Sequence, residues 1–99
     1  MDIVDLTKEY FLKLTKENFN IDNYYLERHG NEVERWAKKI LEIKVDANRE
    51  IVLLGVWLHD IGQLIGYKEI DHAINSEIEA RRFLGEKGVE REVIEKVAH

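Results

Sequence analysis

Four histidines are the residues of this sequence best suited to chemistry, and one of them precedes an aspartate. His59 and Asp60 end an apolar run over residues 51–58. The other three histidines are His29, His72 and His99. A carboxylate at the end of an apolar segment is costly to desolvate unless a positive group meets it. Imidazole nitrogens and a carboxylate oxygen together form a ligand set for a divalent transition metal.

The composition excludes several other classes of function. The chain has 99 residues, a net charge of −5 and 44% apolar residues, which indicates one small domain with a packed core and without the basic surface that binds nucleic acid. Cysteine is absent, which excludes disulfides and thiolate metal sites. No apolar run approaches the roughly 20 residues of a membrane span, and no signal peptide is evident at residues 1–20. We therefore expect a cytoplasmic protein that binds neither nucleic acid nor a membrane.

The hydrophobic pattern predicts an all-α fold with about five helices. Proline is absent, and no alternating stretch is long enough for a strand. We expect helices over about 3–17, 22–44, 47–61 and 72–85, and a fifth from about Val89. The expected N-caps are Asp2, Asp22, Asp46 and Asp71, and the expected stops are Gly62, Gly85 and Gly88. The helix over 47–61 is apolar on nearly all sides, so we expect the others to enclose it.

Two of these helices are expected to bring His29 and the His59-Asp60 pair together. His29 lies near the start of the helix over 22–44, on its apolar stripe. This stripe consists of Leu26, Val33, Trp36, Ala37, Ile40 and Leu41. The next helix follows after a short loop, which favours an antiparallel pair in which the end of one helix meets the start of the other. We expect His29, His59 and Asp60 to bind one divalent transition metal: Mn, Fe, Co, Ni or Zn.

Each histidine alone also has a plain structural interpretation. A histidine on an apolar stripe is often a satisfied core residue, His72 can belong to a helix start, and His99 can be an uninvolved chain end. Asp60 is the exception, because the negative end of a helix dipole disfavours a carboxylate. A plain helical bundle would leave Asp60 without a partner, so the combination of these positions favours the metal site.

The residues resemble the HD superfamily of metal-dependent phosphohydrolases. The likeness consists of a helical His29 upstream, the signature His59-Asp60-Ile61-Gly62, the pattern His72-x-x-x-Ser76-x-x-x-Ala80-x-x-x-Leu84 and a helix with Val93 and Val97. It covers about residues 22–99. The resemblance implies an all-α fold and hydrolysis of phosphate esters, often nucleotides. It also implies a metal held by His29, His59 and Asp60 together with one later aspartate.

The sequence departs from this family at two places. Gln63 follows the glycine, where the family often has Lys or Glu. The later aspartate ligand has no counterpart before the sequence ends at His99. We therefore expect the N-terminal part of an HD domain over 22–99, preceded by a packing helix over 3–17. Apolar surface left uncovered in such a chain would favour a homo-oligomer.

The expected function is hydrolysis of a small phosphorylated substrate, with a nucleotide among the candidates, by a metal-activated water. Asp60 and His72 are the expected catalytic residues. His72 and His99 could contact phosphate, transfer a proton or complete a second metal site. Substrate phosphates could also meet Arg28, Arg81 and Arg82, although solvated helix charges need no such role. The alternative is a catalytically incomplete helical module that binds metal, a nucleotide or a partner chain.

Overall fold

The computed structural model describes residues 2–17, 21–44, 46–65 and 69–98, with only the backbone described for 21–24. Throughout this part of the chain the regular structure is helical, so the prediction of an all-α fold with about five helices is confirmed. The α-helices are α1 (Ile3–Glu17), α2 (Ile21–Ile43), α3 (Arg49–Leu58), α4 (His72–Glu86) and α5 (Arg91–Ala98). A short 3-10 helix, η1 (Ile61–Gln63), lies between α3 and α4.

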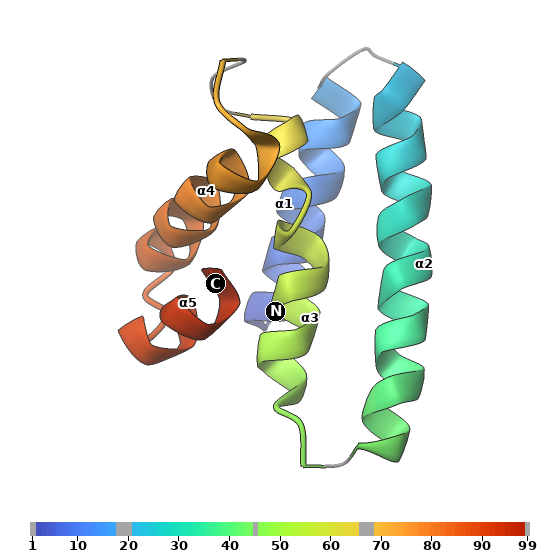
Figure 1. Ribbon diagram of the computed structural model, residues 1–99, viewed down its shortest axis with the longest axis vertical. Coiled ribbons are helices and arrows are strands. Elements are labelled where there is room, and N and C mark those ends of the chain that lie inside the picture. The colour runs from blue at the N-terminus through green and yellow to red at the C-terminus, as the bar shows by residue number, and fades with distance from the viewer. Residues whose placement is uncertain (1, 18–20, 45, 66–68, 99) are drawn as a thin grey trace.

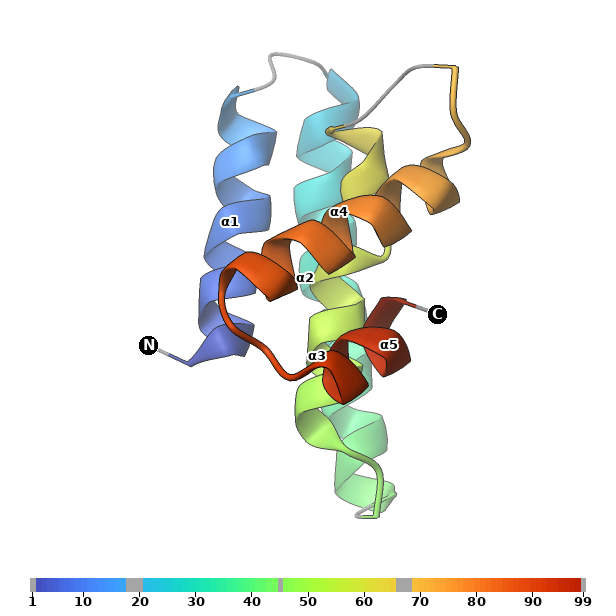
Figure 2. The ribbon, with the colours of Figure 1, turned by 90° about the vertical axis from the view of Figure 1, so that its left-hand side faces the viewer.

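The first three α-helices run up, down and up, so that α2 and α3 are antiparallel neighbours as predicted (Figure 1). The later two helices cover another side of α3. Figure 2 shows α4 crossing in front of the first three helices, with α5 turning back against α3. The central helix is therefore α3, which contacts each of the other four α-helices. None of the helices in the described ranges is long and apolar enough to cross a membrane.

The core forms around the apolar side chains of α3. Trp57 and Leu54 are fully covered, and the ring of Phe11 from α1 lies 5.6 Å from that of Trp57 between centroids. The other helices contribute the buried residues Leu26, Ala37, Leu41, Ala80, Phe83, Leu84 and Ile94. Gly30 of α2 faces Trp57 so closely that a Cβ there would lie 2.7 Å from the indole ring. These contacts fix α2 against α3 and thereby position His29.

The helix starts follow the predicted capping chemistry at two places and differ at a third. The side chains of Asp2 and Asp71 each accept a backbone hydrogen bond of 2.8 Å, at the starts of α1 and α4. The cap of α3 is Asn48, whose Oδ1 accepts from the N–H of Ile51 at 3.1 Å. The prediction of Asp46 is wrong, because Asp46 lies in the turn before that helix. The predicted Asp22 cap follows the first residue of α2, and its side chain lies outside the description.

The helix that precedes the His59-Asp60 pair, α3, ends at Leu58, whereas the sequence predicted an end at residue 61. His59 and Asp60 form a turn, and Asp60 has φ −110° and ψ 5°, which leaves the α-helical region. Gly62 is buried beside α4, where a Cβ would lie 2.2 Å from the carbonyl oxygen of His72. The glycine is therefore needed for close approach of two backbones, and the prediction that it stops the helix is wrong.

Of the other two glycines predicted to end a helix, Gly88 does so and Gly85 does not. Gly85 lies inside α4, whereas Gly88 has φ 77° and ends the helix as predicted. The fifth helix begins at Arg91 rather than at Val89. The predicted apolar stripe of α2 divides into two faces: Leu26, Ala37 and Leu41 are buried, but Trp36 and Ile40 are more than half exposed.

Candidate metal centre

Three side chains from two parts of the chain meet at one end of the α2–α3 pair. Nε2 of His59 lies 2.9 Å from Oδ2 of Asp60, and Nε2 of His29 lies 3.5 Å from the same oxygen. One ligand atom from each residue lies within 4.8 Å of the other two. Bonds from zinc to nitrogen or oxygen are about 2.0–2.2 Å long, which places ligand atoms of one ion roughly 3–4 Å apart. This group could therefore hold one metal ion after small side-chain adjustments.

The imidazole of His59 is oriented from behind by the main chain. Its Nδ1 lies 2.7 Å from the carbonyl oxygen of Val56, one turn earlier in α3. Because a carbonyl oxygen only accepts, Nδ1 carries the proton and donates it. Nε2 thus faces Asp60 and is the nitrogen available to an ion. Metal-binding histidines commonly donate their second ring N–H to a backbone carbonyl or carboxylate, and His59 has this arrangement.

The electrostatics of the pair favour a charged histidine beside a charged carboxylate. The hydrogen bond to Asp60 raises the pKa of His59, although partial burial opposes the increase. The same hydrogen bond holds the pKa of Asp60 below its ordinary value, with help from Gln63 and His29. Gln63 donates from Nε2 to Oδ1 of Asp60 at 3.2 Å. A divalent ion at this position would take the place of the proton on Nε2.

Contacts to α4 hold the turn that carries the pair. The N–H of Gly62 donates to Oγ of Ser76 at 2.8 Å, and this hydrogen bond is buried. Gly62 also packs against the backbone of His72. Ser76 and Gly62 thus have a structural role, because their hydrogen bond holds the turn against α4.

The candidate centre is half-open to solvent. The side chains of His29 and Asp60 are half-buried and that of His59 is more exposed. The ring of Tyr25 stacks on that of His29, with centroids 5.7 Å apart. A cavity of about 270 Å³ between α3, α4 and α5 borders His59. Its small lining residues include Gly55, Ala73, Ser76, Ala80 and Ala98, and no lysine or arginine is among the described residues around it.

The structure does not bring His72 into this group. His72 is exposed at the first position of α4 and is not one of the three converging residues. His99 lies outside the described residues. Arg28, another candidate, is exposed on α2.

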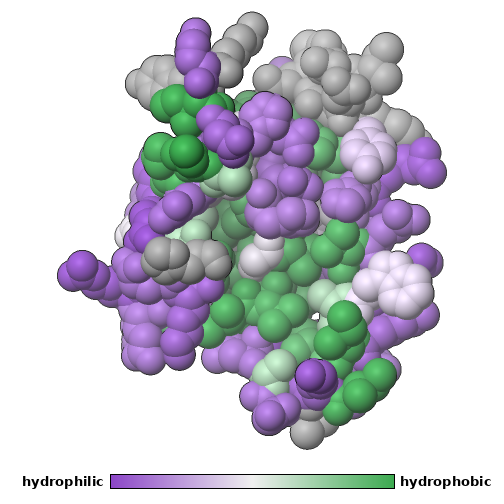
Figure 3. Space-filling model, viewed as in Figure 1, coloured by the Kyte–Doolittle hydropathy of each residue, from purple (hydrophilic) through white to green (hydrophobic). Residues whose placement is uncertain are grey.

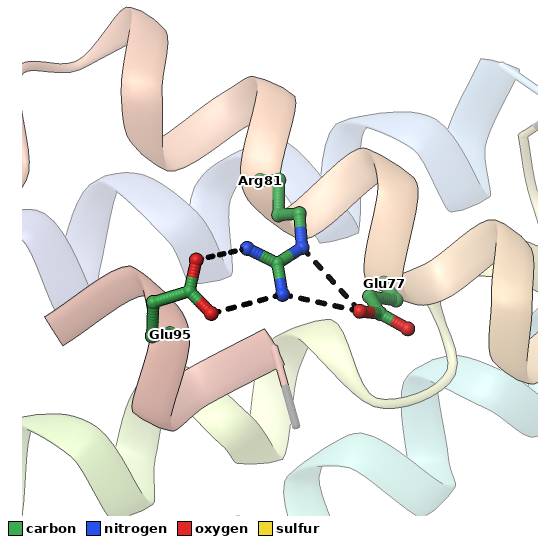
Figure 4. Close-up of polar contacts among 3 residues, drawn as sticks. All are labelled: Glu77, Arg81 and Glu95. Atoms are coloured by element: carbon green, nitrogen blue, oxygen red, sulfur yellow. Dashed lines mark hydrogen bonds and ion pairs between the residues drawn. The ribbon is translucent and has the colours of Figure 1, made fainter. Parts of the chain in front are cut away.

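Two of the predicted phosphate-binding arginines are engaged with carboxylates. The guanidinium of Arg81 binds both oxygens of Glu95 on α5, at 2.5 and 3.2 Å, and also contacts Glu77 (Figure 4). Arg82 binds Glu79 and Glu86 and donates to the hydroxyl of Tyr10 at 3.0 Å. These pairs join α4 to α5 and to α1, which supports the structural interpretation of both arginines.

Sequence reasoning missed three groups around the centre. Gln63 was noted in the sequence only as a departure from the HD pattern. Its position three residues after Asp60 was the signal that could have predicted their contact. Tyr25 precedes His29 by one helical turn, which predicts that the two rings are neighbours. The carbonyl of Val56 has no side-chain signature, so the sequence contains no direct sign of it.

No protein-family model, curated protein or solved structure matches this chain. The geometry of the site and the residue pattern are therefore what bear on the function of this chain. Together they establish an all-α chain with a His29–His59–Asp60 group that could hold a metal ion.

Proposed function

We propose that this chain is a metal-dependent phosphohydrolase whose metal is held by His29, His59 and Asp60. The main support is the convergence of two imidazole nitrogens and a carboxylate oxygen within 4.8 Å of one another. The turn that supplies two of them contains the His59-Asp60-Ile61-Gly62 signature, which resembles the HD superfamily. The support is the convergence of ligand atoms rather than an unsatisfied carboxylate, because Asp60 is only half-buried and already has His59, His29 and Gln63 as partners.

The protein groups have distinct parts in this proposal. A divalent metal here supplies an activated water and polarises a phosphoryl oxygen. Asp60 offers Oδ2 to the ion while Gln63 fixes its other oxygen. His59 offers Nε2 because the carbonyl of Val56 holds its Nδ1 proton. His29 approaches from α2, so the ion joins two elements of the fold.

The cavity beside His59 suggests how a substrate is arranged. Its volume of about 270 Å³ and its small side chains suit the compact organic part of a phosphate ester, while the phosphate lies toward the metal ligands. A nucleotide remains among the candidates. His72 begins the helix whose next turns line this cavity, and we propose it as a phosphate-contacting or proton-transferring residue.

Metal content is the first test of the proposal. The wild-type protein is loaded separately with Mn²⁺, Ni²⁺ or Zn²⁺, desalted and analysed for metal beside Asp60→Ala. We expect about one ion per chain in the wild type and almost none in the variant. Asp46→Ala is a matched control, because it removes an exposed carboxylate from a turn away from the group. A wild-type protein that retains no metal, or an Asp60→Ala variant that retains all of it, would contradict the assignment.

Turnover then separates an enzyme from a binding module. We expect metal-dependent hydrolysis of p-nitrophenyl phosphate or its bis ester by the wild type, and loss of that turnover in Asp60→Ala. The alternative is a noncatalytic metal-binding module. It is supported by the incomplete ligand group, which in the described part of the chain has three residues and lacks the later aspartate that the HD resemblance implies. Stoichiometric metal without turnover of any phosphate ester would favour this alternative.

A further inference from the structure

The second apolar face of α2 is left largely uncovered by the other described residues. Trp36, Ile40 and Ile43 expose 57, 55 and 82% of their surface. Tyr25, 64% exposed, lies on the same side of the helix. We call these four residues the α2 stripe. Within the described residues, the only other large apolar side chains with such exposure are Ile74 and Ile78, both on α4.

The α2 stripe follows the spacing of a helix-packing surface. From Trp36 to Ile40 and Ile43 the steps are four and three residues, which keeps the side chains on one line along the helix. From Tyr25 to Ile43 this line is about 27 Å long at 1.5 Å per residue. Figure 3 shows apolar side chains gathered over α3 and along the lower half of α2. Aromatic and large aliphatic side chains in such a row are typical of protein interfaces.

Charged residues beside the stripe indicate which partner fits. Glu32 and Lys39 lie on one flank of the stripe, two helical turns apart, and Trp36 is almost midway between them along the helix. Two antiparallel copies of α2 related by a twofold axis near Trp36 would place Glu32 against the partner's Lys39, and Lys39 against the partner's Glu32. The same register places Arg28 near the partner's Glu42.

We propose that a second copy of this chain packs on the α2 stripe, with the two α2 helices antiparallel and the twofold axis close to Trp36. In this register Trp36 meets the partner's Trp36 close to the axis, and a Glu32–Lys39 pair of opposite charges lies on either side of it, as a symmetric dimer requires. None of the four stripe residues is a proposed metal ligand, and the interface adjoins the metal centre only through Tyr25, whose ring stacks on that of His29.

Sedimentation velocity over a range of concentrations tests the interface. We expect a wild-type species of twice the 11.7 kDa chain mass. Ile40→Glu is expected to weaken association at least tenfold, whereas Ile78→Glu should leave it unchanged. The two isoleucines are matched, since each exposes 55% of its surface, on α2 and α4 respectively. A wild-type monomer at every concentration, or equal effects of both variants, would overturn the proposal and leave the stripe to a partner of different sequence.

A charge exchange tests the antiparallel arrangement itself. Lys39→Glu leaves acids facing acids and is expected to weaken the dimer severalfold, in a manner that added salt reduces. The double variant E32K/K39E restores opposite charges across the twofold axis and should recover the wild-type association. Glu32 and Lys39 lie on the exposed surface of α2 in both chains of the dimer. We therefore expect each variant to keep its fold, which circular dichroism checks. A double variant no stronger than Lys39→Glu would overturn the proposed register.

Discussion

Both oxygens of the Asp60 carboxylate have partners in the structure. Oδ2 faces the imidazoles of His59 and His29, and Oδ1 accepts a hydrogen bond from Gln63. The favourable charges and the partial exposure together offset the cost of placing a carboxylate at a helix end. The proposed metal ion thus follows from the convergence of three ligand residues and not from an unmet need of Asp60, whose neighbouring side chains already satisfy it.

Gly62 gives a residue-level prediction about stability. A Cβ at this position would lie 2.2 Å from the carbonyl oxygen of His72 and 2.5 Å from the backbone nitrogen of Ser76. Backbone atoms of α4 cannot yield as a flexible side chain could, so Gly62→Ala should destabilise the protein by about 3 kcal/mol, the upper part of the usual range for overpacking. Urea unfolding measures this difference.

Gly85→Ala is the matched control for that substitution. A Cβ at Gly85 meets nothing within 4 Å, and the residue lies in the last turn of α4. Alanine is the better helix former, so this variant should be neutral or more stable by up to about 1 kcal/mol. If Gly62→Ala proved as stable as Gly85→Ala, the close approach of η1 and α4 would be wrong.

Glu34 gives a prediction about pH. Its carboxylate accepts hydrogen bonds from Nε1 of Trp57 at 2.8 Å and from Nζ of Lys8 at 3.1 Å. Burial alone would raise the pKa of Glu34, but these two donors outweigh it and keep the pKa below the ordinary value of 4.5. The folded state thus holds this proton less tightly than the unfolded state. The stability that Glu34 contributes is present above about pH 4.5 and is lost as the pH falls through the lowered pKa.

Glu34→Gln should therefore be less stable than the wild type at neutral pH by about 1.5–2 kcal/mol, in the lower part of the range for hydrogen bonds to charged groups. The difference should shrink steadily below pH 4.5, as measured by thermal unfolding across pH. Glu17→Gln is the control, because that side chain is 55% exposed and only pairs with Lys13 at 3.9 Å. A constant difference between wild type and Glu34→Gln from pH 3 to 7 would argue against the lowered pKa.

At the scale of elements, α5 packs against α3 and α4, and a polar clamp contributes to its attachment. It has eight residues, of which Ile94 alone is classed as buried, and Arg81 of α4 clamps its Glu95 with two hydrogen bonds (Figure 4). Arg81→Met should increase the local opening of α5 while leaving the main unfolding transition almost unchanged. Hydrogen exchange with mass spectrometry would detect this as faster exchange confined to Arg91–Ala98.

Lys96→Met is the control for the clamp. Lys96 pairs with Glu92 at 3.5 Å within the same helix and so does not join α5 to another element. We expect its exchange pattern to match the wild type closely. Equal exchange in both variants would mean that apolar packing, rather than the Arg81 clamp, holds α5 in place.

The helices themselves were largely predictable, whereas their ends were not. Apolar spacing predicts α1 over the residues that it occupies, and the Asp71 cap predicts the start of α4. The sequence offers both Asp46 and Asn48 as plausible caps, and only the path of the turn selects Asn48. Trp36 and Ile40 continue an apolar pattern on α2, but spacing alone cannot tell a core residue from one that faces outward.

At the scale of the whole molecule, the convergence of His29 with the His59-Asp60 pair could be predicted because it depends only on two consecutive antiparallel helices. The surroundings of the group could not be predicted in this way. The Val56 carbonyl depends on where α3 ends, and the buried Gly62–Ser76 hydrogen bond depends on how α4 crosses the bundle. His72 begins a helix as predicted, but its distance from the group is also decided by that crossing.

The proposed metal would connect parts of the molecule that are distant in sequence, so its binding should stabilise the whole fold. At a free metal concentration one hundred times its dissociation constant, binding to the native state alone contributes about 2.7 kcal/mol. For a domain of this size that corresponds to an increase of roughly 10–20 °C in the melting temperature. Thermal unfolding with and without Mn²⁺, Ni²⁺ or Zn²⁺ measures the change, and Asp60→Ala should abolish it.

Hydrogen exchange then locates the stabilisation. Because His29 lies on α2 and His59 and Asp60 follow α3, an ion bound by all three should slow exchange in the α2 turn around His29 and in residues 59–63. An ion held only by His59 and Asp60 would protect the second segment and leave the first unchanged. Binding at unrelated surface carboxylates would protect neither segment and would persist in Asp60→Ala. The pattern of protection therefore distinguishes a centre that joins two helices from a local or adventitious one.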